Sequence, residues 1–314
     1  MDHTKVAAQA CDAANVHGSV FERFPAHETN LGSLKILRLL PVRQKRLVGP
    51  WCFLDRFGPL SFTEAKPMDV APHPHIGLQT VSWLLQGEIV HNDSLANEAL
   101  LTPGGVNVMT SGAGIAHAEE TPPRNSGVLN GVQLWIALPD ADRNGQASFQ
   151  HIKQVPVLEQ RGGSVSVFAG SVLECSSPAK HFSSILGADI TLHPTVTLEL
   201  PLDHSFEHAA LLMTGDAEID GQPIDPTGIW YLGIGRSRVE FKSTTGGRVL
   251  LLGGPPFPEK ILMWWNFVAR TPEEIAQARS DWQTQQRFGE VEAYRGPRLH
   301  APPLQRFAAP NPAS

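Results

Sequence analysis

Two short stretches of the chain pair residues of metal-binding type at a spacing of two. "PHPH" contains His73 and His75, and "GIAHAEE" contains His117 and Glu119. Residues i and i+2 of a β-strand point to the same face, so each pair presents both side chains together if its stretch is extended. If the two strands face each other inside a barrel, three imidazoles and one carboxylate converge on a single point.

This donor set predicts a divalent transition metal. Three neutral nitrogens and one hard oxygen suit Fe(II), Mn(II), Ni(II), Cu(II) or Zn(II), and an octahedral ion would keep about two positions for water, substrate or dioxygen. The set contains no thiolate, which argues against a closed structural zinc site. A single histidine is more often a surface or hydrogen-bonded core residue, but two such pairs beside Gly/Pro turns favour the metal.

Nearby residues offer competing ligands. His91 and Glu98 flank the hairpin tip "HNDSLANE", so we expect both to face solvent or the rim of a pocket. Glu120 follows Glu119 directly and would point to the opposite face of the strand. The predicted metal ligands are therefore His73, His75, His117 and Glu119.

The composition excludes several classes of protein. The 314 residues include 25 Lys and Arg against 31 Asp and Glu, for a net charge of −6, and no basic stripe that would bind nucleic acid directly. No apolar run reaches the ~18–20 residues that span a bilayer. The three cysteines form no close pair, which favours a reducing compartment. We therefore expect a cytoplasmic protein with no membrane partner.

Short strands dominate the expected secondary structure. The 28 glycines and 26 prolines separate β-branched and aromatic runs such as "TVSWLL" and "NGVQLWIALP", which is typical of an all-β protein. One helix is expected over 271–287, with Thr271 as N-cap, Pro272 in the first turn and Glu274 completing a capping box. The polar stretch 140–165 is expected to connect two domains, spanning 1–145 and 146–314.

An internal repeat supports two similar barrels. "LLQGEI" and "LMTGDAEI" align Gly87 with Gly215, and "PGGVNVMTSG" and "PTGIWYLGIG" align Gly112 with Gly235. In the second copy the four ligand positions are occupied by residues that cannot form the same site, namely Pro201, Asp203, Glu240 and Lys242. One metal ion per chain is expected, in the N-terminal half.

The motif-rich segment resembles the pirin family of the cupin superfamily. "HPHIGLQTVSWLLQGEIVHNDSLANE" followed by "LTPGGVNVMTSGAGIAHAEE" contains, in order, the HPH, Gly-Glu, D-S-L-x-N-E and G-I-x-H-x-E elements of that family. The resemblance implies a bicupin, with two β-barrel domains, a short C-terminal helix and a metal, usually iron, in the N-terminal barrel. The ligands it implies are His73, His75, His117 and Glu119.

Two functions follow from the resemblance. The first is quercetin 2,3-dioxygenase-type cleavage of a flavonol or related enediol-like aromatic, with Fe(II) as the expected cofactor and Glu119 accepting the substrate's hydroxyl proton. The alternative is a non-enzymatic, metal- or redox-dependent regulator that binds a protein partner, because eukaryotic pirins are nuclear coregulators of transcription.

Some positions depart from the usual family pattern. Ala113, Ile76 and Gln79 replace residues that are commonly Arg, basic or aromatic, and Glu. None is a ligand, but we expect them to alter the polarity of the pocket and so the choice of substrate. The segment "WWNF" at 264–267 is expected to pack between the two barrels.

Overall fold

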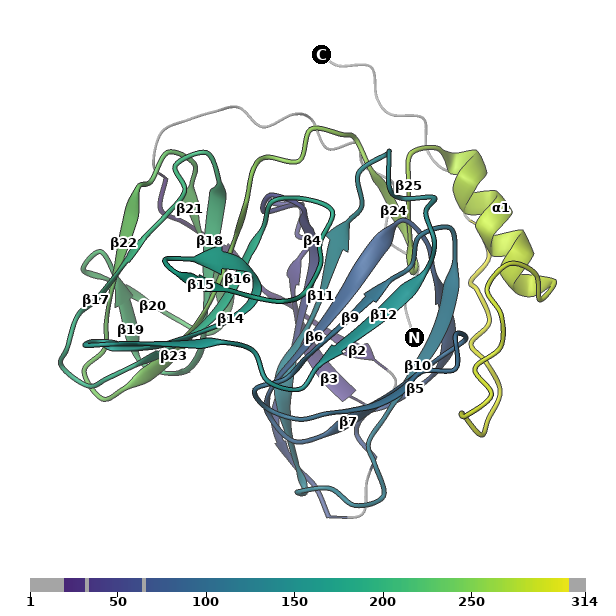
Figure 1. The fold of residues 1–314 in the computed structure, drawn as a ribbon, viewed down its shortest axis with the longest axis horizontal. Helices are drawn as coiled ribbons and strands as arrows, with labels where there is room; N and C mark the ends of the chain where they lie inside the picture. The colour runs from purple at the N-terminus through teal and green to yellow at the C-terminus, as the bar shows by residue number, and fades with distance from the viewer. Residues whose placement is uncertain (1–19, 32–33, 64–65, 305–314) are drawn as a thin grey trace.

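Two β-barrels lie side by side, with one helix on the far flank of the first barrel (Figure 1). The computed structural model describes residues 20–31, 34–63 and 66–304. The predicted all-β architecture with a short C-terminal helix is confirmed. In this described part of the chain, no helix has the length and apolar character needed to span a membrane.

The first barrel combines a seven-stranded and a four-stranded antiparallel sheet. The larger sheet has the order β12-β9-β6-β11-β4-β3-β2 and the smaller one β5-β10-β7-β8. Apolar side chains from both sheets, including Phe57, Leu84 and Ile89, form the core between them. The strands are β2 (His27–Leu31), β3 (Leu34–Leu40), β4 (Trp51–Ser61), β5 (Asp69–His75), β6 (Leu78–Gln86), β7 (Ile89–Asp93), β8 (Glu98–Leu101), β9 (Val106–Thr110), β10 (Ile115–Glu120), β11 (Val128–Ala137) and β12 (Ser148–Ile152).

The second barrel repeats this plan. Its larger sheet has the order β1-β21-β18-β23-β16-β14-β13, with β15 beside β14, and its smaller sheet is β17-β22-β19-β20. The strands are β1 (Glu22–Pro25), β13 (Val157–Gln160), β14 (Gly163–Val172), β15 (Cys175–Ser176), β16 (Leu186–Leu192), β17 (Leu198–Pro201), β18 (Glu207–Gly215), β19 (Ala217–Ile219), β20 (Gln222–Ile224), β21 (Gly228–Gly233), β22 (Arg238–Lys242) and β23 (Gly247–Gly254).

Two strands lie in the barrel to which they do not belong by sequence order. β1, at the start of the described chain, pairs with β21 of the second barrel. β12, which follows the expected connection at residue 145, pairs with β9 of the first barrel. The stretch 140–165 therefore contains strands, and the boundary between 145 and 146 stays a prediction.

A large apolar cluster joins the facing sheets of the two barrels. Buried tryptophans of the first barrel also make polar contacts across this interface. The indole nitrogen of Trp51 donates to the carbonyls of Leu186 (3.1 Å) and Gly253 (3.2 Å), and that of Trp83 donates to Asp189 (2.6 Å). The polar atoms of the buried indoles are thereby satisfied, so burial of these large side chains stabilises the interface.

The helix α1 (Pro272–Gln283) begins as predicted and ends four residues earlier than expected. The Thr271 hydroxyl accepts from the Glu274 amide at 3.3 Å. The Glu274 carboxylate accepts from the Arg270 amide at 2.8 Å, one residue before the cap that a standard capping box would use. The buried face of the helix consists of Ile275, Ala278 and Trp282.

The segment 264–267 does not lie between the barrels, contrary to the prediction. It forms the turn of a hairpin between β24 (Leu262–Trp264) and β25 (Phe267–Ala269). Trp264, Trp265 and Phe267 pack in one cluster with the buried face of α1 and with side chains of β10 and its neighbours. The hairpin therefore covers the outer side of the first barrel, because the apolar face of α1 needs an apolar partner there.

Candidate metal centre

The predicted ligands lie on two adjacent strands of the four-stranded sheet. His73 and His75 are on β5, and His117 and Glu119 are on β10. The strands are antiparallel, with His117 directly opposite His73. They are therefore neighbours within one sheet and do not face each other across the barrel. Directly paired residues have Cβ atoms about 5 Å apart, so the side chains still converge.

The three imidazoles form a compact, buried group. The ring centroids of His73 and His117 lie 4.3 Å apart, and each is 5.0 Å from that of His75. One nitrogen from each ring lies within 4.8 Å of the others. The exposed fractions are 7% for His73 and 1% for each of the other two. Within the described residues, this is the group with the spacing of a metal site.

Backbone carbonyls fix the orientation of two of the rings. His73 Nδ1 lies 2.9 Å from the Ala71 carbonyl, and His75 Nδ1 lies 3.1 Å from the Asn266 carbonyl. A carbonyl oxygen can only accept, so both Nδ1 atoms carry the hydrogen in these contacts. The lone pair of each neutral ring is then on Nε2, which is the tautomer that a metal requires.

His91 is buried behind His117, and the expectation that it faces solvent or a pocket rim is wrong. Its Nδ1 lies 3.4 Å from His117 Nδ1, and its Nε2 lies 3.1 Å from an oxygen of Asp93. The ring of Phe149 stacks on it at 4.1 Å with an interplanar angle of 2°. If His91 donates to Asp93, it can accept from His117 Nδ1–H, and this leaves His117 Nε2 free. Glu98 is exposed, as expected.

The reason for the burial of His91 is the pairing of β7 with β10, which places it opposite Glu119. A sequence signal was available, because His91 and Asp93 share the i, i+2 spacing of the other pairs. The sequence pattern instead predicts His91 beside a hairpin tip, facing solvent or the rim of a pocket. The actual tip is shorter, with the turn around Leu95 and Ala96.

Burial keeps the three histidines uncharged. It lowers the pKa of His73 to about 4, and it lowers the pKa values of His75 and His117 well below 6.5, with a further contribution from the neighbouring histidines. A metal binds the deprotonated ligand, so protons compete little for these three nitrogens at neutral pH. The same burial would be unfavourable for three protonated imidazoles.

Glu119 is buried but lies outside the three-histidine group in this conformation. Its Oε1 is 3.2 Å from the Ser82 hydroxyl oxygen, which is also 2.8 Å from Gln133 Oε1. The one hydroxyl hydrogen can serve only one of these acceptors. Burial raises the pKa of Glu119, and His91 opposes this shift. Glu119 as ligand and proton acceptor stays a prediction.

A metal ion fits the nitrogen group on geometry as well as on chemistry. His75 Nε2 and His117 Nε2 are 3.0 Å apart. Two nitrogens bound at about 2.1 Å to one ion, at a right angle, would be separated by about 3 Å. The group contains no thiolate, so it suits a metal that prefers nitrogen and oxygen donors.

The hairpin between β24 and β25 supports the centre, a feature that sequence reasoning missed. The Asn266 carbonyl that orients His75 comes from its turn. Gly77, with φ of +69°, allows the end of β5 to approach this hairpin, because a Cβ atom there would lie 2.1 Å from the Val268 carbonyl oxygen. Only glycine fits both the left-handed backbone and the close contact.

Two of the departures from the family pattern point away from the centre, so the prediction that they alter its polarity is wrong. The Gln79 amide donates to Thr110 (2.9 Å) and to the Lys180 carbonyl (3.1 Å), and its oxygen lies 3.0 Å from His181 Nδ1. It therefore contacts the second half of the chain, because odd-numbered residues of β6 face that barrel. Ile76 packs under α1.

The comparisons with known proteins agree with this geometry. Residues 34–136 match the family model Pirin, and residues 187–289 match that of the Pirin C-terminal cupin domain. A Pseudomonas aeruginosa protein named "Putative quercetin 2,3-dioxygenase" is 42% identical over 295 residues, which are 93% of each chain. The chain belongs to the pirin family. The predicted bicupin architecture, with one cupin domain in each half, is thereby confirmed.

Solved structures show the same pirin fold. Quercetin 2,3-dioxygenase from Acinetobacter baumannii is 40% identical with a TM-score of 0.88, over 91% of this chain and 96% of that one. The bacterial pirin YhhW from Escherichia coli, in complex with nickel(II), is 15% identical with a TM-score of 0.59, over 74% of this chain and 96% of that one. The second likeness concerns the fold alone. Family and histidine group together support a metal-dependent pirin-like protein.

Proposed function

We propose that this pirin is an Fe(II)-dependent dioxygenase of the quercetin 2,3-dioxygenase type. Its substrate would be a flavonol or a related enediol-like aromatic, cleaved with dioxygen. The observation that carries the proposal is the group of three buried imidazoles, whose Nδ1 atoms contact neighbouring groups and which bring one nitrogen from each ring within 4.8 Å of the others. The names of the related quercetin 2,3-dioxygenases suggest the substrate class.

The ion would be held by His73, His75 and His117, with Glu119 completing the set. When bound, iron supplies Lewis-acid and redox chemistry toward substrate and dioxygen. The chain's own contribution is to hold the three nitrogens in place before any ligand arrives. The carbonyls of Ala71 and Asn266 do this for two rings, and His91 does it for the third.

Glu119 is suited to take a proton from the substrate hydroxyl. Burial raises its pKa, so its carboxylate is a stronger base than an exposed one. The Ser82 hydroxyl lies beside Oε1, which leaves Oε2 as the oxygen able to turn toward the histidines. A proton accepted there would stay within the buried site.

Aromatic side chains cover one side of the histidine group. The edge of Trp135 meets the His75 ring with centroids 5.2 Å apart, and Phe53 stacks on Trp135 at 4.0 Å. These aromatic side chains form an apolar wall beside the centre. A dry site strengthens the interaction of Glu119 with a developing charge on the substrate.

Oxygen uptake tests the proposal. Protein loaded anaerobically with Fe(II) should consume dioxygen when quercetin is added, and His75→Ala should abolish both the bound iron and the uptake. Glu119→Gln, compared per bound iron, should reduce turnover by about 10²-fold or more, as expected for loss of a general base. His27→Ala changes an exposed histidine of β2 and serves as the control. Absence of uptake with Fe(II), Mn(II), Ni(II) and Cu(II) would refute the activity.

A further inference from the structure

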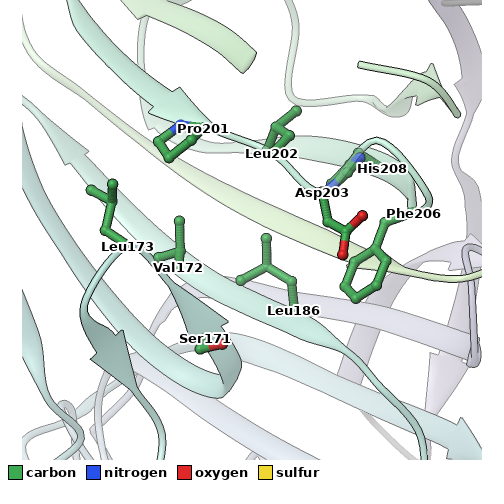
Figure 2. A pocket seen from close by; sticks show the side chains of 9 residues that line it. All are labelled: Ser171, Val172, Leu173, Leu186, Pro201, Leu202, Asp203, Phe206 and His208. Carbon is green, nitrogen blue, oxygen red and sulfur yellow. The ribbon is translucent and has the colours of Figure 1, made fainter. Parts of the chain in front are cut away.

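The second barrel contains a cavity that the proposed reaction does not use. Its volume is about 270 Å³, and it lies at the end of the barrel where the β14–β15 turn meets the loop between β17 and β18 (Figure 2). Six of its nine lining residues are apolar and three are polar, and the cavity exposes polar and apolar surface in similar amounts. The lining residues are Ser171, Val172, Leu173, Leu186, Pro201, Leu202, Asp203, Phe206 and His208.

His208 points into this cavity from within the barrel. On β18, Ala210 and Leu212 pack in the core of the second barrel, and His208 has the same parity. Its exposed fraction is 0%. It pairs with Gly253 of β23, where a Cβ atom would lie only 2.7 Å from His208 Cδ2. The ring can therefore occupy this position only because the neighbouring strand has a glycine there.

Neither nitrogen of His208 makes a hydrogen bond in the described structure. The Phe206 backbone is close enough to raise the pKa of the ring, but no hydrogen bond of ordinary geometry joins the two. Burial lowers the pKa of His208 to about 4, so the ring is neutral at pH 7 and offers one donor and one acceptor. Buried polar groups without a partner are rare in folded proteins, so a water or a ligand group is expected to complete this one.

Asp203 gives the mouth of the cavity a negative charge. Its Oδ1 accepts from the Ser205 amide (2.9 Å) and hydroxyl (2.7 Å), and these hydrogen bonds hold its pKa below the usual value. Its carboxylate is drawn beside Phe206 at the edge of the cavity (Figure 2). An anionic ligand is disfavoured beside this group, and a ligand with a hydroxyl donor is favoured.

We propose that this cavity is a second binding site, which takes a small, uncharged, one-ring phenol. The ring would lie against Val172, Leu186 and Phe206. Both nitrogens of His208 are covered in this structure, so the imidazole would rotate toward the cavity to hydrogen-bond with the hydroxyl. A dry cavity of about 150 Å³ is enough for benzene, so the larger volume here accommodates a substituted single ring. Leu173, exposed by 44% and with φ of +51°, extends the apolar surface at the rim.

The inference is independent of the metal centre and of the proposed reaction. The cavity residues belong to the second barrel, and the three-histidine group belongs to the first. Small-molecule sites combine apolar side chains with a few polar groups, and this cavity offers both. The site would therefore bind its ligand whether or not the first barrel holds iron.

The test is a titration of the full chain with 4-fluorophenol, followed by fluorine NMR. The protein carries His75→Ala and is stripped of metal, so that phenol cannot bind at the first barrel through an ion. Two variants probe the cavity: His208→Phe keeps an aromatic ring but removes the hydrogen bonds, and Ser171→Trp narrows the opening from an exposed position. His204→Phe, at an exposed neighbouring histidine outside the lining, is the matched control.

We expect saturable binding that weakens about 10-fold in His208→Phe, as for loss of one hydrogen bond to a buried group. Ser171→Trp should weaken it comparably, and His204→Phe should change it by less than about twofold. 4-Fluoroanisole, which cannot donate a hydrogen bond, and 4-fluorobenzoate should both bind more weakly than the phenol. If His208→Phe does not fold, the binding of 4-fluorophenol to Ser171→Trp tests the proposal. Absence of binding up to about 10 mM, or unchanged binding in the folded cavity variants, would overturn the proposal.

Discussion

Replacement of His91 by phenylalanine should weaken metal binding without removing any ligand. His91 is the only contact that the described structure gives to His117 Nδ1, at 3.4 Å. In the metal-bound state, Nε2 is occupied, so Nδ1 must carry a hydrogen that needs an acceptor. Phenylalanine offers none, and the hydrogen would be left unsatisfied in a buried position. Phe149 could still stack against the new ring, as it does on His91.

The magnitude follows from these contacts. An unsatisfied buried donor costs about 1–3 kcal/mol, and the 3.4 Å separation is longer than an ordinary hydrogen bond, which places this one in the lower half of that range. In the metal-free state His117 can move its hydrogen to Nε2 and donate to His75, 3.0 Å away. The cost therefore falls on the bound state. Affinity should decrease by about 10-fold, as for other groups that orient a ligand histidine.

Competition with a chromophoric chelator measures this effect, with Ni(II) as the ion for both proteins. Phe149→Leu is the control, because it removes the stacked ring and keeps both hydrogen bonds of His91. It should change affinity by less than about threefold. Thermal unfolding checks that both variants are folded. The reasoning is refuted if His91→Phe binds Ni(II) within twofold of the wild type, or if Phe149→Leu loses as much affinity.

Two further predictions concern the support of the centre and the dependence of stability on pH. Gly77→Ala should destabilise the chain by about 2 kcal/mol or more beyond Gly221→Ala in urea unfolding. Both glycines have positive φ, +69° and +76°, but only at Gly77 would a Cβ atom meet a carbonyl oxygen, at 2.1 Å. Equal losses would contradict the steric argument. Burial lowers the pKa of His181 to about 4, so below pH 6.5 the unfolded chain takes up a proton that the folded chain refuses. Stability is therefore unaffected above pH 6.5 and falls as the pH drops toward 4, by at most about 3 kcal/mol for this residue. His181→Leu should remove this pH-dependent loss of stability. The unfolding free energy of the variant, relative to that of the wild type, should therefore increase as the pH falls from 7 to 4. A difference that stays constant with pH would show that His181 is not the cause.

The grouping of the three histidines could be predicted because their placement is local. His73 and His75 point together whenever the stretch is a strand, and His117 required only that β10 be a strand as well. The N-terminus of α1 was likewise set by Thr271 and its neighbours. These features depend on a few consecutive residues and on general preferences of the backbone.

The features that could not be predicted from the sequence depend on contacts between distant segments. The burial of His91 follows from the pairing of β7 with β10, and the orientation of His75 follows from a carbonyl 191 residues away. The segment "WWNF" packs where it does because the apolar face of α1 lies there. The orientation of Gln79 depends on its contact with the second half of the chain. In each case the residue type was compatible with several surroundings, and only the tertiary fold selected one of them.

The central claim is that three histidines of the first barrel hold one metal ion. Its most direct test is the metal content of the wild type and of His75→Ala after anaerobic loading with Fe(II) and removal of free ion, measured by mass spectrometry of the elements. We predict about one equivalent of iron per chain for the wild type and less than about a tenth for the variant. Wild type without bound iron, a second equivalent, or a variant that keeps its iron would contradict the claim.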